Sequence, residues 1–148
     1  MDKAVSVERR LAAMKEFYLA GVRTTCFISP IFPGITDIKA IIRRAMLQCN
    51  LIWLENLNLR GGYKTVIMDY IKEKYPQLYP LYHEIYDCKN MDYWIALDKE
   101  IKAFAAETGL DYVTNDDSMN RPFGAPPVIV NYFYHSEIKK SAVKNISI

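Results

Sequence analysis

Two polar segments of the chain, residues 29–37 and 55–62, are the best candidates for ligand chemistry. Each follows an apolar run, and together they contain hydroxyl, carboxylate and amide side chains and two turns built on glycine. A small number of such polar groups is what a pocket uses to hold a small ligand in one orientation. In parallel βα units these segments lie beyond the carboxyl ends of the strands, where ligands bind. We therefore expect the functional surface at these two loops.

The second segment contains Glu55, Asn56 and Asn58, with Leu57 between the two asparagines. In a regular strand both amides lie on one face and the Glu55 carboxylate on the other. A polar group on a buried strand is costly unless it is hydrogen-bonded. The asparagines therefore have two interpretations, as ligand contacts or as groups that cap the Pro33-Gly34 turn. Glu55 also has two, as a paired core carboxylate or as a substrate contact.

Other polar residues favour structural roles. His83 lies among tyrosines, and His135 has no partner at the spacing of metal ligands, so no metal site is expected. Asn115, Asp116 and Asp117 end a predicted strand and form a helix-capping or turn cluster, or lie on the active face if the sheet belongs to a barrel. The sequence contains no Ser-His-Asp arrangement, phosphate-binding glycine loop or dinucleotide fingerprint. It therefore names no catalytic residue.

Composition and cysteine spacing predict a soluble cytoplasmic protein. The 148 residues are 51% hydrophobic with a formal net charge of +2, and the basic residues are spread out, so no nucleic-acid footprint is expected. Cys26, Cys49 and Cys88 are widely and irregularly spaced, which favours reduced thiols. No apolar run reaches the roughly 18 residues of a membrane span, and Met1 to Ser6 is no secretory signal.

Hydrophobic periodicity predicts alternating helices and strands in a single domain, residues 1–148. The expected helices are 5–20, one from Ile38 to Cys49, one around 66–71, a short one over 78–86 and a long one over 91–108. The expected strands are 22–29, 51–57 and 110–115, with 128–134 extended and 116–127 a loop. We expect Thr36 to cap the second helix and Pro30 to end the first strand. The order predicts an α/β fold with parallel strands.

The segment Phe27 to Asp37, a strand leading into Pro-Gly-x-Thr-Asp and then a helix, is similar to the fifth-strand region of radical S-adenosylmethionine enzymes. Glu8 to Met14 and Ala20 to Thr24 resemble the preceding helix and strand entry, and Asn50 to Gly62 resembles the sixth strand. The spore photoproduct lyase-like branch, in particular its mobile-pair protein B-like members, is the nearest in pattern. The resemblance covers about Ser6 to Tyr134. It implies a partial TIM-like βα barrel with additional C-terminal helices.

The family's Cys-x-x-x-Cys-x-x-Cys loop, which ligates a [4Fe–4S] cluster, has no counterpart in this chain. Cys26, Cys49 and Cys88 do not substitute for it, and we expect them to be buried small hydrophobic residues. The resemblance therefore implies the C-terminal half of such an enzyme, from a truncated gene or an excised fragment. The complete enzyme would use S-adenosylmethionine and the cluster. This half alone is expected to hold neither tightly and to be catalytically incompetent.

By position, the resemblance implies that Ser29, Pro30, Pro33 and Gly34 form one wall of the S-adenosylmethionine pocket, and that Asn56 and Asn58 form its floor. A half barrel of the strands 22–29, 51–57 and 110–115 would leave a strand edge open. It would also uncover an inner face that carries some of four apolar residues: Cys26, Ile28, Ile52 and Leu54. We therefore expect a homodimer, or completion by an N-terminal half.

Two alternatives remain open: a non-enzymatic interaction module completed by another chain, and an unrelated α/β domain that binds a small phosphate or nucleotide compound. The substrate is unknown. Relatives that act on thymine dimers make nucleic acid conceivable, but the charge pattern does not support it.

Overall fold

The structure, a computed structural model, describes residues 4–113 and 126–133. The helices are α1 (Val7–Leu19), α2 (Ile38–Ala45), α3 (Tyr63–Lys74), the 3₁₀ helix η1 (Pro76–Leu78), α4 (Tyr79–Tyr86) and α5 (Asp92–Thr108). The strands are β1 (Thr25–Ile31), β2 (Leu51–Asn56), β3 (Asp111–Val113) and β4 (Val128–Asn131). The chain is thus of the α/β class, as its periodicity predicts.

The four strands form one sheet in the order β1-β2-β4-β3, and every neighbouring pair is parallel. Strand β4, which is buried along its whole length, lies between β2 and β3. The strand at 111–113 therefore does not lie next to β2. This differs from the half-barrel expectation, which built the sheet from 22–29, 51–57 and 110–115 alone. Strands β1 and β2, connected by α2, are neighbours both in sequence and in the sheet, as in a barrel. Strands β3 and β4 are neighbours too, but β2 pairs with β4 and not with β3, which departs from the order of a barrel.

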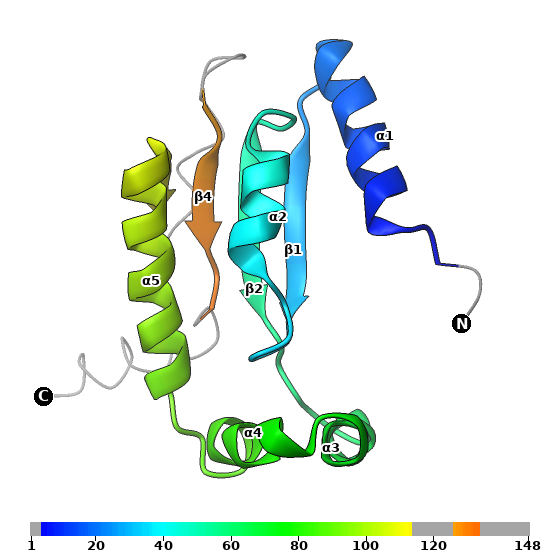
Figure 1. Cartoon of the computed structure of the whole chain (residues 1–148), viewed down its shortest axis with the longest axis vertical. Coiled ribbons are helices and arrows are strands. Elements are labelled where there is room, and N and C mark those ends of the chain that lie inside the picture. The colour runs from blue at the N-terminus through cyan, green and yellow to red at the C-terminus, as the bar shows by residue number, and fades with distance from the viewer. Residues whose placement is uncertain (1–3, 114–125, 134–148) are drawn as a thin grey trace, which may run out of the picture.

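Helices α2 and α5 cover one face of the sheet, and α1 lies beside β1 (Figure 1). The core beneath them contains Cys26 and Ile28 of β1 and Ile52 and Leu54 of β2, none more than 8% exposed. The expectation that these side chains line an uncovered inner face was wrong. Their alternation does place them on one face, but helix side chains such as Ile42 and Phe104 cover that face.

A second core closes the carboxyl ends of the strands. Helices α3 and α4 lie below these ends (Figure 1). Met68, Ile71 and Tyr82 of the two helices pack with Leu57, the residue that follows β2. This layer determines which parts of the strand-end loops remain accessible.

Local chemistry explains two differences from the sequence-based boundaries. Strand β1 continues through Pro30 to Ile31 because the register shifts between Ile28 and Ile31. A proline, which lacks an amide hydrogen, is accommodated at such an irregularity on an edge strand. Helix α2 is capped by Asp37, whose carboxylate accepts from the Ala40 amide at 3.1 Å. The Thr36 hydroxyl accepts from the Phe32 amide instead.

Within the described ranges 4–113 and 126–133, no helix has both the length and the apolar character that crossing a membrane requires.

Candidate ligand-binding site

The face of the sheet opposite the helices carries the first candidate group. We call it the open sheet face and define it by Phe27, Ser29, Trp53, Glu55 and Tyr132. The side chains that pack near it, including Leu51 and Val130, form a cluster with no contribution from any described helix. It is therefore the face that would line the interior if the sheet belonged to a barrel.

Ser29 and Glu55 are joined on this face. The Ser29 hydroxyl donates to Glu55 Oε2 at 2.9 Å and so links the carboxyl-terminal parts of β1 and β2. Ser29 is half-buried and Glu55 is exposed. The paired-core-carboxylate interpretation of Glu55 is therefore excluded, because a core carboxylate would be shielded from water.

Aromatic rings lie beside this pair. Trp53 stacks on Tyr132 with ring centroids 4.2 Å apart and an interplanar angle of 17°. Phe27 approaches Trp53 edge-on at 6.1 Å, and its side chain is 56% exposed. Stacked and edge-on pairs of this kind are favourable beyond the area they bury. They give the face an apolar aromatic surface next to a carboxylate.

The two asparagines lie elsewhere, around a cavity of about 170 Å³ at the end of β2. Its wall also includes Tyr86, Trp94 and Phe133. Asn58 is exposed, and its amide oxygen accepts from Arg60 at 3.3 Å, a contact within its own loop rather than a cap on the Pro33-Gly34 turn. Asn56 is half-buried, and its side-chain amide has no hydrogen-bond partner among the described residues. Asn56 is therefore the better candidate for a ligand contact.

The Pro33-Gly34 turn is packed against the protein. Pro33 is fully buried, and the Gly34 amide donates to the Tyr93 hydroxyl at 3.0 Å. Gly34 has φ +70°, and a Cβ atom there would lie 2.9 Å from Leu78 Cδ2. This turn joins the β1–α2 loop to η1 and α5. Pro30, by contrast, is exposed on β1.

The six residues assigned to the S-adenosylmethionine pocket thus occupy three environments. Ser29 and Pro30 lie on β1, with Ser29 on the open sheet face; Asn56 and Asn58 line the end cavity; Pro33 and Gly34 form the packed turn. Asn115, Asp116, Asp117 and His135 lie outside the described residues.

A groove of about 370 Å³ runs between α1 and β1. Its lining includes Val7 and Met14 of α1 and Phe27, Ser29 and Pro30 of β1. Among the described residues, β1 pairs only with β2, so its other edge faces this groove. Phe27 and Ser29 belong to both the groove and the open sheet face, so the two surfaces are continuous.

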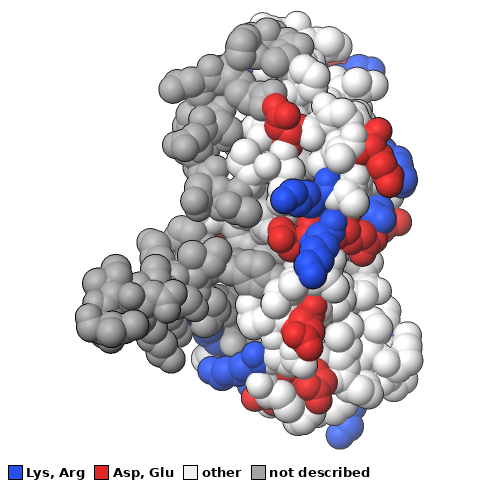
Figure 2. Space-filling model, turned by 90° about the vertical axis from the view of Figure 1, so that its left-hand side faces the viewer, with Lys and Arg blue, Asp and Glu red and all other residues white. Residues whose placement is uncertain are grey.

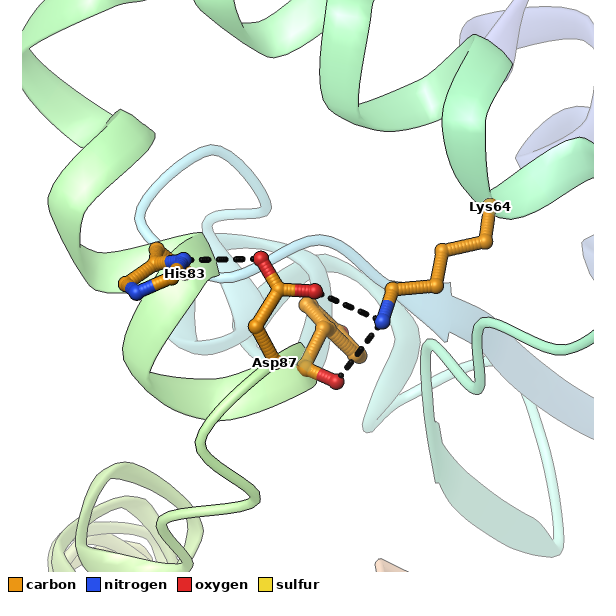
Figure 3. Close-up of polar contacts among 4 residues, drawn as sticks. Lys64, His83 and Asp87 are labelled. Atoms are coloured by element: carbon orange, nitrogen blue, oxygen red, sulfur yellow. Dashed lines mark hydrogen bonds and ion pairs between the residues drawn. The ribbon is translucent and has the colours of Figure 1, made fainter.

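His83 belongs to a polar contact between α3 and α4 (Figure 3). Asp87 accepts from Lys64 Nζ at 2.7 Å and contacts His83 Nδ1 at 2.8 Å, and Lys64 also donates to the Tyr86 carbonyl at 3.0 Å. These bonds lower the pKa of the Asp87 carboxyl, with the Lys64 hydrogen bond as the largest cause. The arrangement supports a structural role for His83, because it joins the ends of two helices.

The cysteines do not form a cluster site. Cys26 and Cys49 are buried as expected, but the expectation for Cys88 was wrong, because it follows α4 on the surface and is exposed. The described residues contain no group of three or more His, Cys, Asp or Glu able to hold a metal ion. Burial raises the pKa of Cys26 to about 11 and that of Cys49 to about 12. A [4Fe–4S] cluster is held by several cysteine thiolates brought close together. The donor set described here does not fit a [4Fe–4S] cluster.

Charge gives no sign of a nucleic-acid surface on the α5 side. Figure 2 shows acidic and basic side chains interspersed there. Glu100 of α5, for example, is paired with Lys39 at 2.6 Å. A polyanion is attracted by a continuous basic area. The described part of this face has none.

Sequence reasoning missed the stacking of Trp53 on Tyr132 and a polar network between α5 and the sheet. In that network Asp98 accepts from the Tyr112 hydroxyl and, at 2.5 Å, from the Asn131 amide. Asn131 is only 5% exposed. The one signal in the sequence was a polar residue that ends the apolar run Val128 to Val130.

Comparison with known proteins gives one curated relative. The chain is 33% identical over 76 residues to the uncharacterized protein MJ0683 of Methanocaldococcus jannaschii. The match covers 51% of this chain and 29% of the relative, so the chain spans less than a third of that protein's length. No family model matches the chain. No solved structure matches it significantly. The chain is therefore similar to part of a longer archaeal protein whose function its name does not give.

Proposed function

We propose that this chain is the C-terminal part of a radical S-adenosylmethionine enzyme and forms one wall of its cofactor and substrate pocket. The observation that carries the proposal is the Ser29–Glu55 hydrogen bond at adjacent carboxyl-terminal strand segments, on a face that no described helix covers. Ligands of parallel βα folds bind at this end of the strands. The similarity of Phe27 to Asp37 to the family's fifth-strand region adds the identity of the cofactor.

The open sheet face and the end cavity have groups suited to the adenosyl part of the cofactor. Adenine needs an apolar surface together with a few donors and acceptors. On the open sheet face, Trp53 and Phe27 supply the surface and Ser29 supplies a polar group. Asn56 supplies a further polar group separately, in the end cavity. The cluster, which would bind and cleave the cofactor, has to come from a segment with three closely spaced cysteines. In this proposal the chain binds and orients the cofactor, and the segment that carries the cluster would start the reaction.

Titration of the ¹⁵N-labelled chain with S-adenosylhomocysteine, followed by amide chemical shifts, tests this role. Millimolar affinity is expected, with perturbations confined to residues 27–29 and 53–58. Asn56→Ala should weaken binding by about 1–3 kcal/mol, the cost of leaving a buried partner unpaired. Asn90→Ala is the matched control, because the Asn90 side chain bonds Asp92 and Glu84 in the α4–α5 turn. Absence of shifts, or an equal effect of the two substitutions, would contradict the proposal.

The groove beside β1 favours a second candidate, an interaction module without activity of its own. A strand edge beside a groove is a site at which another chain can add a strand. The two candidates differ in one measurable respect. The interaction module requires a protein partner but no response to S-adenosylhomocysteine.

A further inference from the structure

The Glu55 carboxylate has one oxygen fixed and the other available. Oε2 accepts from the Ser29 hydroxyl at 2.9 Å, and the side chain is exposed. Among the described residues, no lysine, arginine or histidine nitrogen lies within ion-pair distance of Glu55. The hydrogen bond to Ser29 orients the carboxylate without neutralising its charge. Within the described part of the chain, the open sheet face therefore has an oriented carboxylate without a cationic partner.

Aromatic rings lie on the same face of the sheet as this charge. Glu55 is two residues after Trp53 on β2, so both side chains point to the same side of the sheet. The Tyr132 amide donates to the Leu54 carbonyl at 2.8 Å, which places Tyr132 beside this part of β2, and its ring stacks on Trp53. Phe27, opposite Trp53 in the β1–β2 register, leaves more than half of its surface in solvent.

A carboxylate beside aromatic rings is selective for one class of ligand group. A cation gains from the negative face of an aromatic ring and from a charge-assisted hydrogen bond to the carboxylate. A neutral group gains only the apolar contact, and an anion is repelled by Glu55. The combination therefore discriminates by charge as well as by shape.

We propose that the open sheet face binds the ammonium or guanidinium group of a small organic ligand. Glu55 is the anionic partner, Trp53 and Phe27 supply the aromatic surface, and Ser29 is a positioning residue that holds the carboxylate. The inference goes beyond the proposed function and stands on the geometry of this face alone. It assigns a positive charge to the ligand group that the site accepts.

Two probes of nearly equal shape and different charge test the site. Benzylammonium and benzyl alcohol are titrated separately into the ¹⁵N-labelled chain, and binding is followed by the Trp53 indole signal and the Ser29 and Glu55 amides. Benzylammonium should bind about tenfold more tightly, equivalent to about 1.4 kcal/mol. Glu55→Gln should reduce the ratio of the two affinities to about one. Glu100→Gln is the control: it removes an exposed carboxylate that pairs with Lys39 on the helix face, and should leave the ratio unchanged.

Three results would overturn the inference: equal affinity for the two probes, an unchanged ratio in Glu55→Gln, or shifts confined to residues outside the open sheet face. Because Glu55 is exposed, its replacement should not affect folding, and a denaturation curve for each variant verifies this. Ser29→Ala, which keeps the charge but frees the carboxylate, should lower benzylammonium affinity without abolishing the preference. Neither probe contains adenosine, so failure here leaves the S-adenosylhomocysteine test intact.

Discussion

The Ser29 hydroxyl donates a 2.9 Å hydrogen bond to the Glu55 carboxylate across the carboxyl-terminal parts of two parallel strands. The two residues are 26 positions apart and belong to different apolar runs. Their contact connects the two segments whose composition first suggested ligand chemistry. The contact lies on the sheet face that no described helix covers.

Packing at Gly34 should make this glycine hard to replace. In Gly34→Ala, the left-handed backbone at φ +70° costs about 1–2 kcal/mol, and the new Cβ meets Leu78 Cδ2 at 2.9 Å. Gly21→Ala is a matched control, because its φ is +81° but no atom lies within 4 Å of its added Cβ. Chemical denaturation should therefore show a larger loss of unfolding free energy for Gly34→Ala than for Gly21→Ala.

The same substitution made in a Leu78→Ala background separates the two causes. Truncation of Leu78 removes the atoms that the new Cβ would meet, so the cost of Gly34→Ala should fall to that of Gly21→Ala. Equal losses for the two glycines in the unmodified chain would show that the Leu78 contact is unimportant.

Cys88 should be alkylated quickly in the folded chain, and Cys26 and Cys49 slowly. Desolvation raises the pKa values of Cys26 and Cys49 to about 11 and 12, so at about pH 8 their reactive thiolates are rare in the folded chain. Mass spectrometry after brief alkylation should find Cys88 modified and the other two only after unfolding. Rapid modification of all three under native conditions would contradict the buried positions.

The raised thiol pKa values also set the sign of a pH effect on stability. A group whose pKa is higher in the folded state contributes stability below its unfolded pKa, and loses it as the pH rises through the folded value. The unfolding free energy should therefore decline above about pH 8.5, the ordinary value for cysteine. Cys26→Ala should make that decline shallower, whereas Cys88→Ala should not.

The Lys64–Asp87–His83 contact should make the unfolding free energy depend on pH in the acidic range. Its hydrogen bonds lower the Asp87 pKa, so its stabilisation is present above the ordinary aspartate value of about 4 and is lost as the pH falls through the lower folded value. Denaturation curves at several pH values below about 5 should show a shallower acid decline in Asp87→Asn than in the unmodified chain. Asp69→Asn, on the exposed surface of α3, is the control and should keep the original slope. Identical slopes for the two variants would refute the role of Asp87.

The alternation of apolar residues predicted the helices, the parallel strands and the grouping of Cys26, Ile28, Ile52 and Leu54 on one face. It did not say which face the helices cover, because β2 has apolar side chains on both. The insertion of β4 between β2 and β3 was equally hidden, since four consecutive buried residues fit either position in a sheet.

The candidate site was predictable only in part. Ser29 and Glu55 were identifiable because polar residues followed apolar runs, a local signal. The stacking of Trp53 on Tyr132 depends on the register between β2 and β4, which no local pattern encodes. The same holds for the hydrogen bond from Gly34 to Tyr93, 59 residues away, which makes the Pro-Gly turn part of the packing.

The open edge of β1 leads to a last prediction, on assembly. Among the described residues this edge has no strand partner, and the adjoining groove exposes apolar side chains, with Val7 51% and Phe27 56% accessible. Unpaired backbone groups beside apolar surface favour strand addition. We therefore expect a two-fold dimer that buries the β1 edges, with sedimentation equilibrium at micromolar concentration giving twice the 17.2 kDa chain mass. Val7→Glu, which places a charge in the groove, should shift the equilibrium to monomer. Val66→Glu, a control at an exposed position on α3, should not, because Val66 does not line the groove. A monodisperse 17.2 kDa species that binds no apolar dye would refute the dimer and the need for any chain to complete this edge.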